Sequence, residues 1–119
     1  MPKKARVLVV DSDLHTLSKI YLSLIHRNYK VEATDNAQEI TARVDRFKPR
    51  LVILRSSTKN LTQEVYEELA GKRLNVLLIA DENEVIPVEW RKLEVIQMPP
   101  DVTSFDAKIM EILNIVELP

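Results

Sequence analysis

Residues that could bind a metal ion or a phosphoryl group follow the first apolar run of the chain. The stretch VLVVDSDLHTLSKI, residues 7–20, passes from four apolar residues into Asp11, Ser12 and Asp13, with His15 two positions further on. Carboxylate oxygens are the ligands that Mg²⁺ prefers, and histidine is a common ligand of transition metals. The sequence therefore raises the question of which metal, phosphoryl group or cofactor these residues could hold.

The composition excludes several kinds of site. The chain has 119 residues, a net charge of −1, no cysteine and one glycine. Without cysteine there is no disulfide or thiolate chemistry, and a phosphate-cradling loop needs more glycines than one. The near-zero net charge favours neither nucleic acid nor an anionic membrane surface, and no apolar run is long enough to span a bilayer. We expect one cytoplasmic domain over residues 1–119 that contacts neither nucleic acid nor membrane.

The apolar periodicity alternates between strands and helices. The expected strands are residues 6–10, 30–34, 51–54, 76–80 and 93–98. Helical spacing is expected from Leu14 to Ile25, from Asn36 to Phe47, over residues 62–70, briefly over residues 88–93, and from Phe105 to Val116. Strands that alternate with helices predict an α/β fold: a doubly wound, five-stranded parallel sheet in three layers, with functional residues beyond the carboxyl ends of the strands.

Short polar signals mark the expected helix ends. Asp13 is a candidate N-cap for the first helix, and Asn36 with Glu39 is typical of a capping box that opens the second. Pro49 should stop that second helix, and Gly71 should end the third.

The pattern of strand ends resembles a known family. The entry VLVVDSD, the third-strand run KPRLVIL and the Met-Pro pair after the fifth strand are similar to the receiver domain of bacterial two-component response regulators. The resemblance covers essentially the whole chain and implies a flavodoxin-like fold with a role in signal transduction.

The residues that the resemblance implies for phosphotransfer are nearly all replaced. In the family, an aspartate after the third strand accepts the phosphoryl group, two adjacent acids after the first strand help to hold Mg²⁺, a Thr or Ser follows the fourth strand, and a Lys precedes the fifth-strand proline. Here the acceptor position is Arg55, the acidic pair is Asp11 followed by Ser12, the hydroxyl position is Ile79 and the lysine position is Met98. The resemblance thus implies a degenerate member, or pseudo-receiver, with no catalytic residue, metal or cofactor.

The replacements remove the chemistry of a phosphoacceptor. A guanidinium stays protonated and is no nucleophile, and a cation beside one or two acids disfavours Mg²⁺, although residual Mg²⁺ binding at Asp11 and Asp13 stays open. Ser56 and Ser57 lack an evident general base that would activate them. We expect Arg55 to form an ion pair with Asp11, with Asp13 as a third member of the group, in place of the metal and the phosphoryl group.

A receiver-like domain without its acceptor implies a phosphorylation-independent module that binds a protein partner. The third and fourth helices are expected to be shorter than the family usually has. Trp90 and Val88 in the fourth-helix region, with Val95 at the family's aromatic switch position, are candidates for contact with a partner of unknown identity, and a homodimer stays open.

Three alternatives remain. The chain could be the N-terminal regulatory domain of a larger response regulator that controls transcription or a second messenger. Phosphorylation could instead use Asp13 or another acid. A remote alternative is a cobalamin-binding domain, because Asp13-Leu14-His15 matches the start of its Asp-x-His-x-x-Gly motif; here Ser18 stands at the final glycine.

Overall fold

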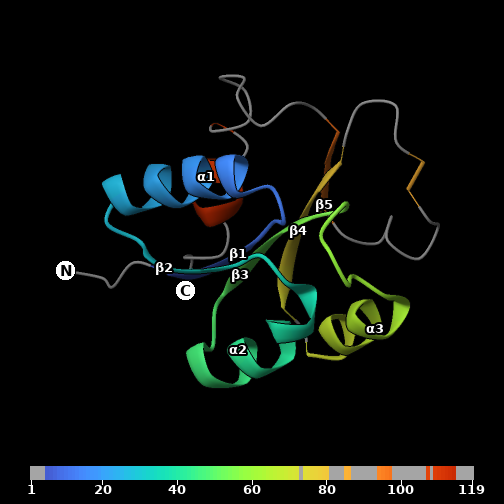
Figure 1. The fold of residues 1–119 in the computed structure, drawn as a ribbon. Coiled ribbons are helices and arrows are strands. Elements are labelled where there is room, and N and C mark those ends of the chain that lie inside the picture. The colour runs from blue at the N-terminus through green and yellow to red at the C-terminus, as the bar shows by residue number, and fades with distance from the viewer. Residues whose placement is uncertain are drawn as a thin grey trace.

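A computed structural model describes residues 5–72, 74–80, 85–86, 94–97, 107 and 109–114 of the chain. The strands are β1 (Arg6–Val10), β2 (Lys30–Thr34), β3 (Leu51–Arg55), β4 (Asn75–Ala80) and β5 (Glu94–Gln97). They form one sheet in the order β2-β1-β3-β4-β5, and every neighbouring pair is parallel (Figure 1). The predicted α/β fold with a parallel sheet is confirmed, because each apolar run became a strand at its expected place.

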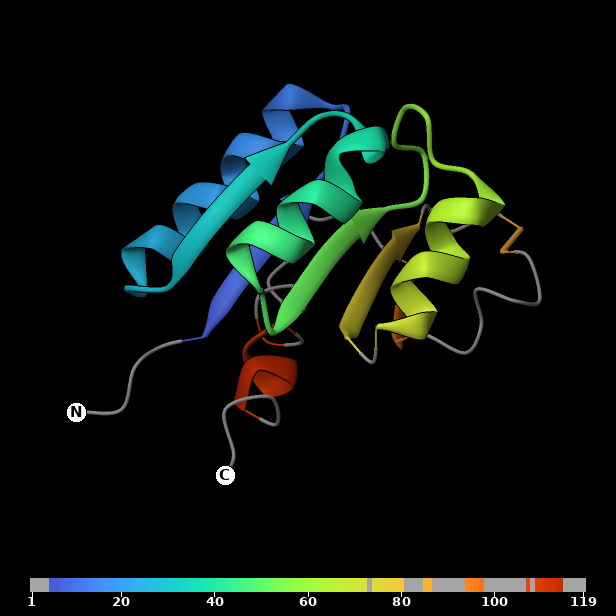
Figure 2. The same ribbon diagram turned by 90° about the horizontal axis from the view of Figure 1, so that it is seen from below.

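Helices cover both faces of this sheet. They are α1 (Leu14–His26), the short 3-10 helix η1 (Ala37–Glu39), α2 (Ile40–Phe47) and α3 (Gln63–Gly71). α1 lies on one face beside helical residues 107 and 109–114, whereas α2 and α3 lie together on the other (Figures 1 and 2). α3 has nine residues, and the predicted fourth helix falls outside the described part of the chain.

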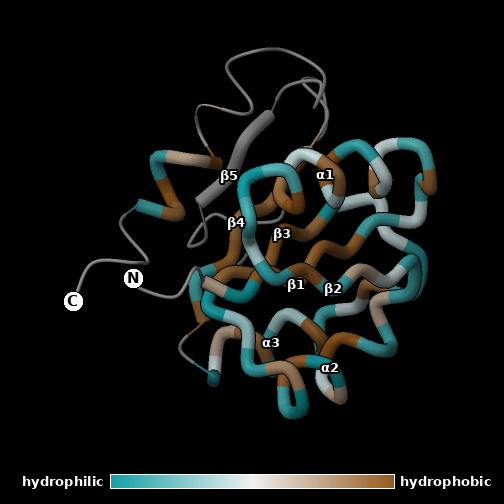
Figure 3. The backbone as a smooth tube through the Cα atoms, turned by 90° about the vertical axis from the view of Figure 1, so that its left-hand side faces the viewer, coloured by the Kyte–Doolittle hydropathy of each residue, from teal (hydrophilic) through white to brown (hydrophobic). Residues whose placement is uncertain are grey.

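Two apolar layers hold the helices to the sheet. Successive strand residues point to opposite faces, so each central strand contributes to both layers. Val9, Ile53 and Ile79 pack on the α1 side, and Val10 and Leu54 pack on the side of α2 and α3. Figure 3 shows the result as a hydrophobic centre along β1, β3 and β4, with polar residues concentrated on the connections.

Local side chains explain most helix ends, with one correction. The Asp13 carboxylate caps α1 as expected, and left-handed Lys48 (φ 53°) ends α2 just before Pro49. The predicted capping box between Asn36 and Glu39 is wrong: Asn36 caps η1 by accepting from the backbone N–H of Gln38. The Glu39 carboxylate instead accepts from Arg43, one helical turn further on, so α2 begins after a 3-10 turn.

Candidate functional site

Asp11 and Arg55 meet at the carboxyl edge of the sheet. β1 and β3 are neighbours in the sheet. Asp11 directly follows β1, and Arg55 is the last residue of β3. The Arg55 guanidinium Nη1 lies 3.9 Å from Asp11 Oδ2, and the two side chains are 14% and 1% exposed. Burial of both side chains lowers the local dielectric constant, and this strengthens the electrostatic attraction between the two charges.

The Asp11 carboxylate is also held by the backbone. The N–H of Asp13 donates to Asp11 Oδ1 at 2.9 Å, and the N–H of Asp11 donates to the carbonyl of Thr34 at 3.2 Å. One carboxylate oxygen is therefore engaged by the turn into α1 while the other faces a cation. A Mg²⁺ ion fits this group poorly, because the guanidinium adds positive charge where the metal needs several oxygen ligands.

The Asp13 side chain caps α1 through both of its carboxylate oxygens. Its Oδ1 accepts from the N–H of His15 at 3.1 Å and its Oδ2 accepts from the hydroxyl of Thr16 at 2.9 Å. The Thr16 hydrogen bond lowers the pKa of the Asp13 carboxyl, and the bond to the N–H of His15 lowers it further. The structure therefore assigns Asp13 an N-cap role.

Two hydroxyls fix the connection between β3 and α3 against the end of β1. The Thr58 side chain, 5% exposed, shares its one hydroxyl hydrogen between the carbonyls of Arg55 at 2.6 Å and Val10 at 3.3 Å. Ser12 Oγ accepts from the N–H of Lys59, whose carbonyl accepts from Ala37. The sequence reasoning missed Thr58, and its only signal was a threonine three residues after the strand end.

The remaining predicted site residues are scattered. Ile79 lies inside β4 in the apolar layer of α1, and its carbonyl accepts from the N–H of Ser56 at 2.9 Å. Ser56 Oγ is buried and has no hydrogen-bond partner among the residues that the structure describes, whereas Ser57 is exposed. Within the described part of the chain, no hydrogen bond joins the Ser56 hydroxyl to a side chain that could act as a base.

Several predicted residues lie outside the described part of the chain. They are Met98 of the expected pocket and the partner-contact candidates Val88 and Trp90; the side chain of Val95 is not described either, and its backbone pairs with Leu78. Over the described ranges, no cluster of three or more His, Asp or Glu side chains could hold a metal ion. No described helix is both long and apolar enough to cross a membrane.

Known structures share this fold, although no family model and no curated protein matches the chain. A CheY-like response regulator receiver domain protein from Methanospirillum hungatei is 20% identical, with a TM-score of 0.83 over 97% of this chain and 98% of that one. The N-terminal domain of the nisin resistance regulator NsrR is 16% identical, with a TM-score of 0.72 over 93% of this chain and 99% of that one. The response regulator TrrA from Thermotoga maritima, in complex with Mg²⁺ and BeF, is 19% identical, with a TM-score of 0.76 over 90% and 97%. The chain thus has the receiver-domain fold.

Proposed function

We propose that this chain is a receiver-like signalling module that binds a protein partner and does so without being phosphorylated. The observation that carries the proposal is the contact between Arg55 and the buried Asp11, which stands at the carboxyl edge of the sheet. In the receiver family that the sequence resembles, this edge holds Mg²⁺ and the phosphoacceptor aspartate. A permanently charged guanidinium in that place supplies the positive charge from within the chain.

The connection after β3 supports the same proposal. Its contacts through Thr58 and Ser12 tie it to β1, and Asn60 donates to Asn36 in the connection after β2. A segment with these cross-links is held in one arrangement in the absence of any phosphoryl group. The surface that it presents is therefore constant, which suits an interaction module better than a switch.

The experiment compares this protein with a receiver that binds a phosphoryl mimic. Amide NMR spectra of the ¹⁵N-labelled chain are recorded with and without Mg²⁺ and beryllofluoride, and Thermotoga TrrA serves as the positive control under the same conditions. We expect no saturable shift at Asp11, Arg55 or Thr58. Mg²⁺-dependent saturation at these amides, or covalent mass gain from acetyl phosphate, would overturn the phosphorylation-independent role.

A second candidate is the N-terminal regulatory domain of a larger response regulator. The structural similarity to the N-terminal domain of NsrR favours it, because this chain covers nearly all of that domain. The two candidates are compatible, since an unphosphorylated receiver can hold an output domain through a fixed surface. The direct test is to read the coding sequence downstream of codon 119: a DNA-binding or nucleotide-cyclising domain would support this candidate, and a stop codon there would remove it.

A further inference from the structure

The outer edge of β2, beneath α1, pairs with no other strand among the residues that the structure describes. β2 is the end strand of the sheet, so only one of its sides pairs with β1. The carbonyl of Thr34 accepts from Asp11 and therefore faces the inner side. Backbone polar groups alternate between the two sides of a strand, so the N–H and C=O groups of Val31 and Ala33 point outward, where they can pair with another strand.

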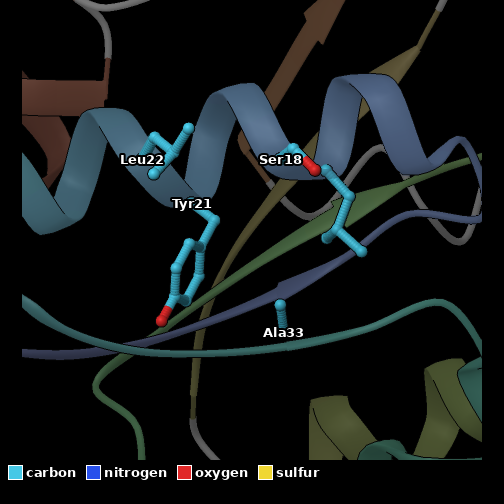
Figure 4. A pocket seen from close by; sticks show the side chains of 5 residues that line it. Ser18, Tyr21, Leu22 and Ala33 are labelled. Atoms are coloured by element: carbon cyan, nitrogen blue, oxygen red, sulfur yellow. The ribbon is translucent and has the colours of Figure 1, made fainter.

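A hollow lies directly above this edge. It has a volume of about 310 Å³ and is lined by Leu17, Ser18, Tyr21, Leu22 and Ala33. Figure 4 shows the Tyr21 ring descending from α1 toward β2, with Ala33 pointing up from the strand beneath it. Because side chains of an added strand would alternate as those of β2 do, every second one would face the α1 side of the sheet, and one of these could enter the hollow.

The helix above the hollow carries exposed apolar residues that nothing in the described chain covers. Leu14 is 61% exposed, Leu22 52% and Ile25 38%. With Ser18 they follow one another at intervals of three or four residues, which places them along one stripe of α1. The stripe borders the hollow, so apolar contact continues from the sheet edge onto the helix.

The charge along α1 and the start of β2 is basic, and apart from Glu32 the nearest acids on either side in the sequence, Asp13 and Asp35, lie at the start of α1 and just after β2. Residues 14–31 contain three Lys or Arg residues and two His residues, and neither Asp nor Glu. Lys19, Arg27 and Lys30 are all exposed. The nearby acid Glu32 points to the opposite face of the sheet, where it pairs with Arg43 at 3.0 Å. A second copy of this chain would bring like charges together, whereas an acidic partner would be attracted.

From these observations we infer that β2 and α1 form a docking site for an extended acidic segment of a partner protein, which adds to the sheet as a strand and places a large apolar side chain in the hollow. Main-chain hydrogen bonds to Val31 and Ala33 would supply affinity, and the hollow with its basic border would supply specificity. This inference rests on the proposed interaction role and names the surface and the partner chemistry for it.

The test uses a defined probe, a peptide of roughly eight residues that alternates Glu with Val and has one central Leu. Amide NMR and hydrogen exchange of the full chain are measured with this peptide, with a version carrying Lys in place of Glu, and with a version N-methylated at alternate residues. We expect saturable shifts and slowed exchange at Val31 and Ala33. Affinity should fall at least about tenfold for the Lys version and for the version N-methylated on the pairing side.

Two matched variants test whether the peptide binds at the proposed surface. Leu22→Glu should weaken the acidic peptide at least about tenfold, whereas Val85→Glu, at another exposed apolar residue (83% exposed), should leave it unchanged. Absence of binding, equal binding of the N-methylated peptide, binding only to anionic vesicles, or self-association that buries this edge would each overturn the inference. None of these outcomes bears on the beryllofluoride experiment, so failure here and failure of the phosphorylation-independent role are distinguishable.

Discussion

At the scale of single residues, one replacement changes the character of the strand-end site. A receiver that is phosphorylated needs a nucleophilic carboxylate after the third strand, and here that position carries Arg55 against the 1% exposed Asp11. A buried carboxylate without compensation is costly, and the guanidinium offsets that cost at any pH at which the protein folds. The pair is therefore a structural element of the carboxyl edge of the sheet.

Removal of Arg55 should destabilise the protein. Arg55→Ala leaves Asp11 buried without its cation, and we expect the free energy of unfolding to fall by roughly 3 kcal/mol. Urea denaturation at neutral pH measures this loss. The double variant Asp11→Asn/Arg55→Met should recover much of it, since neither charge then remains.

A second arginine provides the control for that measurement. Arg46 pairs with Glu32 at 3.6 Å, but its side chain is 70% exposed, so Arg46→Ala should cost less than about 1 kcal/mol. An Arg55→Ala variant as stable as Arg46→Ala would contradict the view that Arg55 neutralises Asp11.

The hydrogen bonds of Asp13 should make the free energy of unfolding depend on pH in the acid range. The bond from Thr16 lowers the pKa of Asp13 below its ordinary value of 3.8. Its contribution is thus fully present above that ordinary value and is lost as the pH falls through the lower folded-state pKa. Asp13→Asn keeps the capping oxygen but no titratable group, so the stability of the variant relative to the wild type should rise as the pH falls below about 4. Urea unfolding of both proteins across this range checks it, and a pH-independent difference would contradict it.

At the scale of elements, the connection from β3 to α3 is held by side-chain hydrogen bonds that no sequence pattern predicts. Thr58 bonds across to β1, and Ser12 reaches forward to Lys59, so the two connections at this edge hold each other. Apolar periodicity predicts where strands lie because burial repeats along them. It does not indicate which loop hydroxyl bonds to a carbonyl distant in the sequence, so the role of Thr58 could not be predicted. The contact between Asp11 and Arg55 could be predicted, because both residues stand at the ends of neighbouring strands.

Loss of the Thr58 hydroxyl should loosen this connection. Thr58→Val keeps the shape but removes both hydrogen bonds, and we expect a loss of about 1–2 kcal/mol together with faster amide exchange in residues 56–61. Thr41→Val provides the matched control, because the hydroxyl of Thr41 bonds to Glu68 at a more exposed site. Equal effects of the two substitutions would show that Thr58 has no special role.

At the scale of the whole molecule, the parallel sheet could be predicted because each buried strand is a continuous apolar run between helical patterns. The start of α2 could not, since the backbone N–H of Asn36 donates to the hydroxyl of Thr34 and the Glu39 carboxylate accepts from Arg43. The residue spacing also fits a capping box, so the sequence pattern does not distinguish these polar partners. Local patterns thus gave the layers, while competition between polar partners decided the details at their edges.

The two apolar layers should stabilise the fold as one cooperative unit. Leu24 on the α1 side and Leu69 on the α3 side are 1% and 2% exposed, and they belong to separate clusters with the sheet between them. Leu24→Ala and Leu69→Ala should each cost about 2–5 kcal/mol, because each leaves a cavity in a packed layer. The double variant should show the sum of the two losses to within about 0.5 kcal/mol, since the sites share no partner.

Urea unfolding followed by far-UV circular dichroism and by fluorescence measures both points, and Leu22→Ala on the exposed stripe is the matched control, with an expected cost below about 0.5 kcal/mol. Coincident transitions by the two probes are expected for a single cooperative unit. Because the strands β1, β3 and β4 contribute residues to both layers, the two layers should unfold together. Two separate transitions, with Leu24→Ala moving only one of them, would mean that the faces fold independently and that the sheet does not couple them.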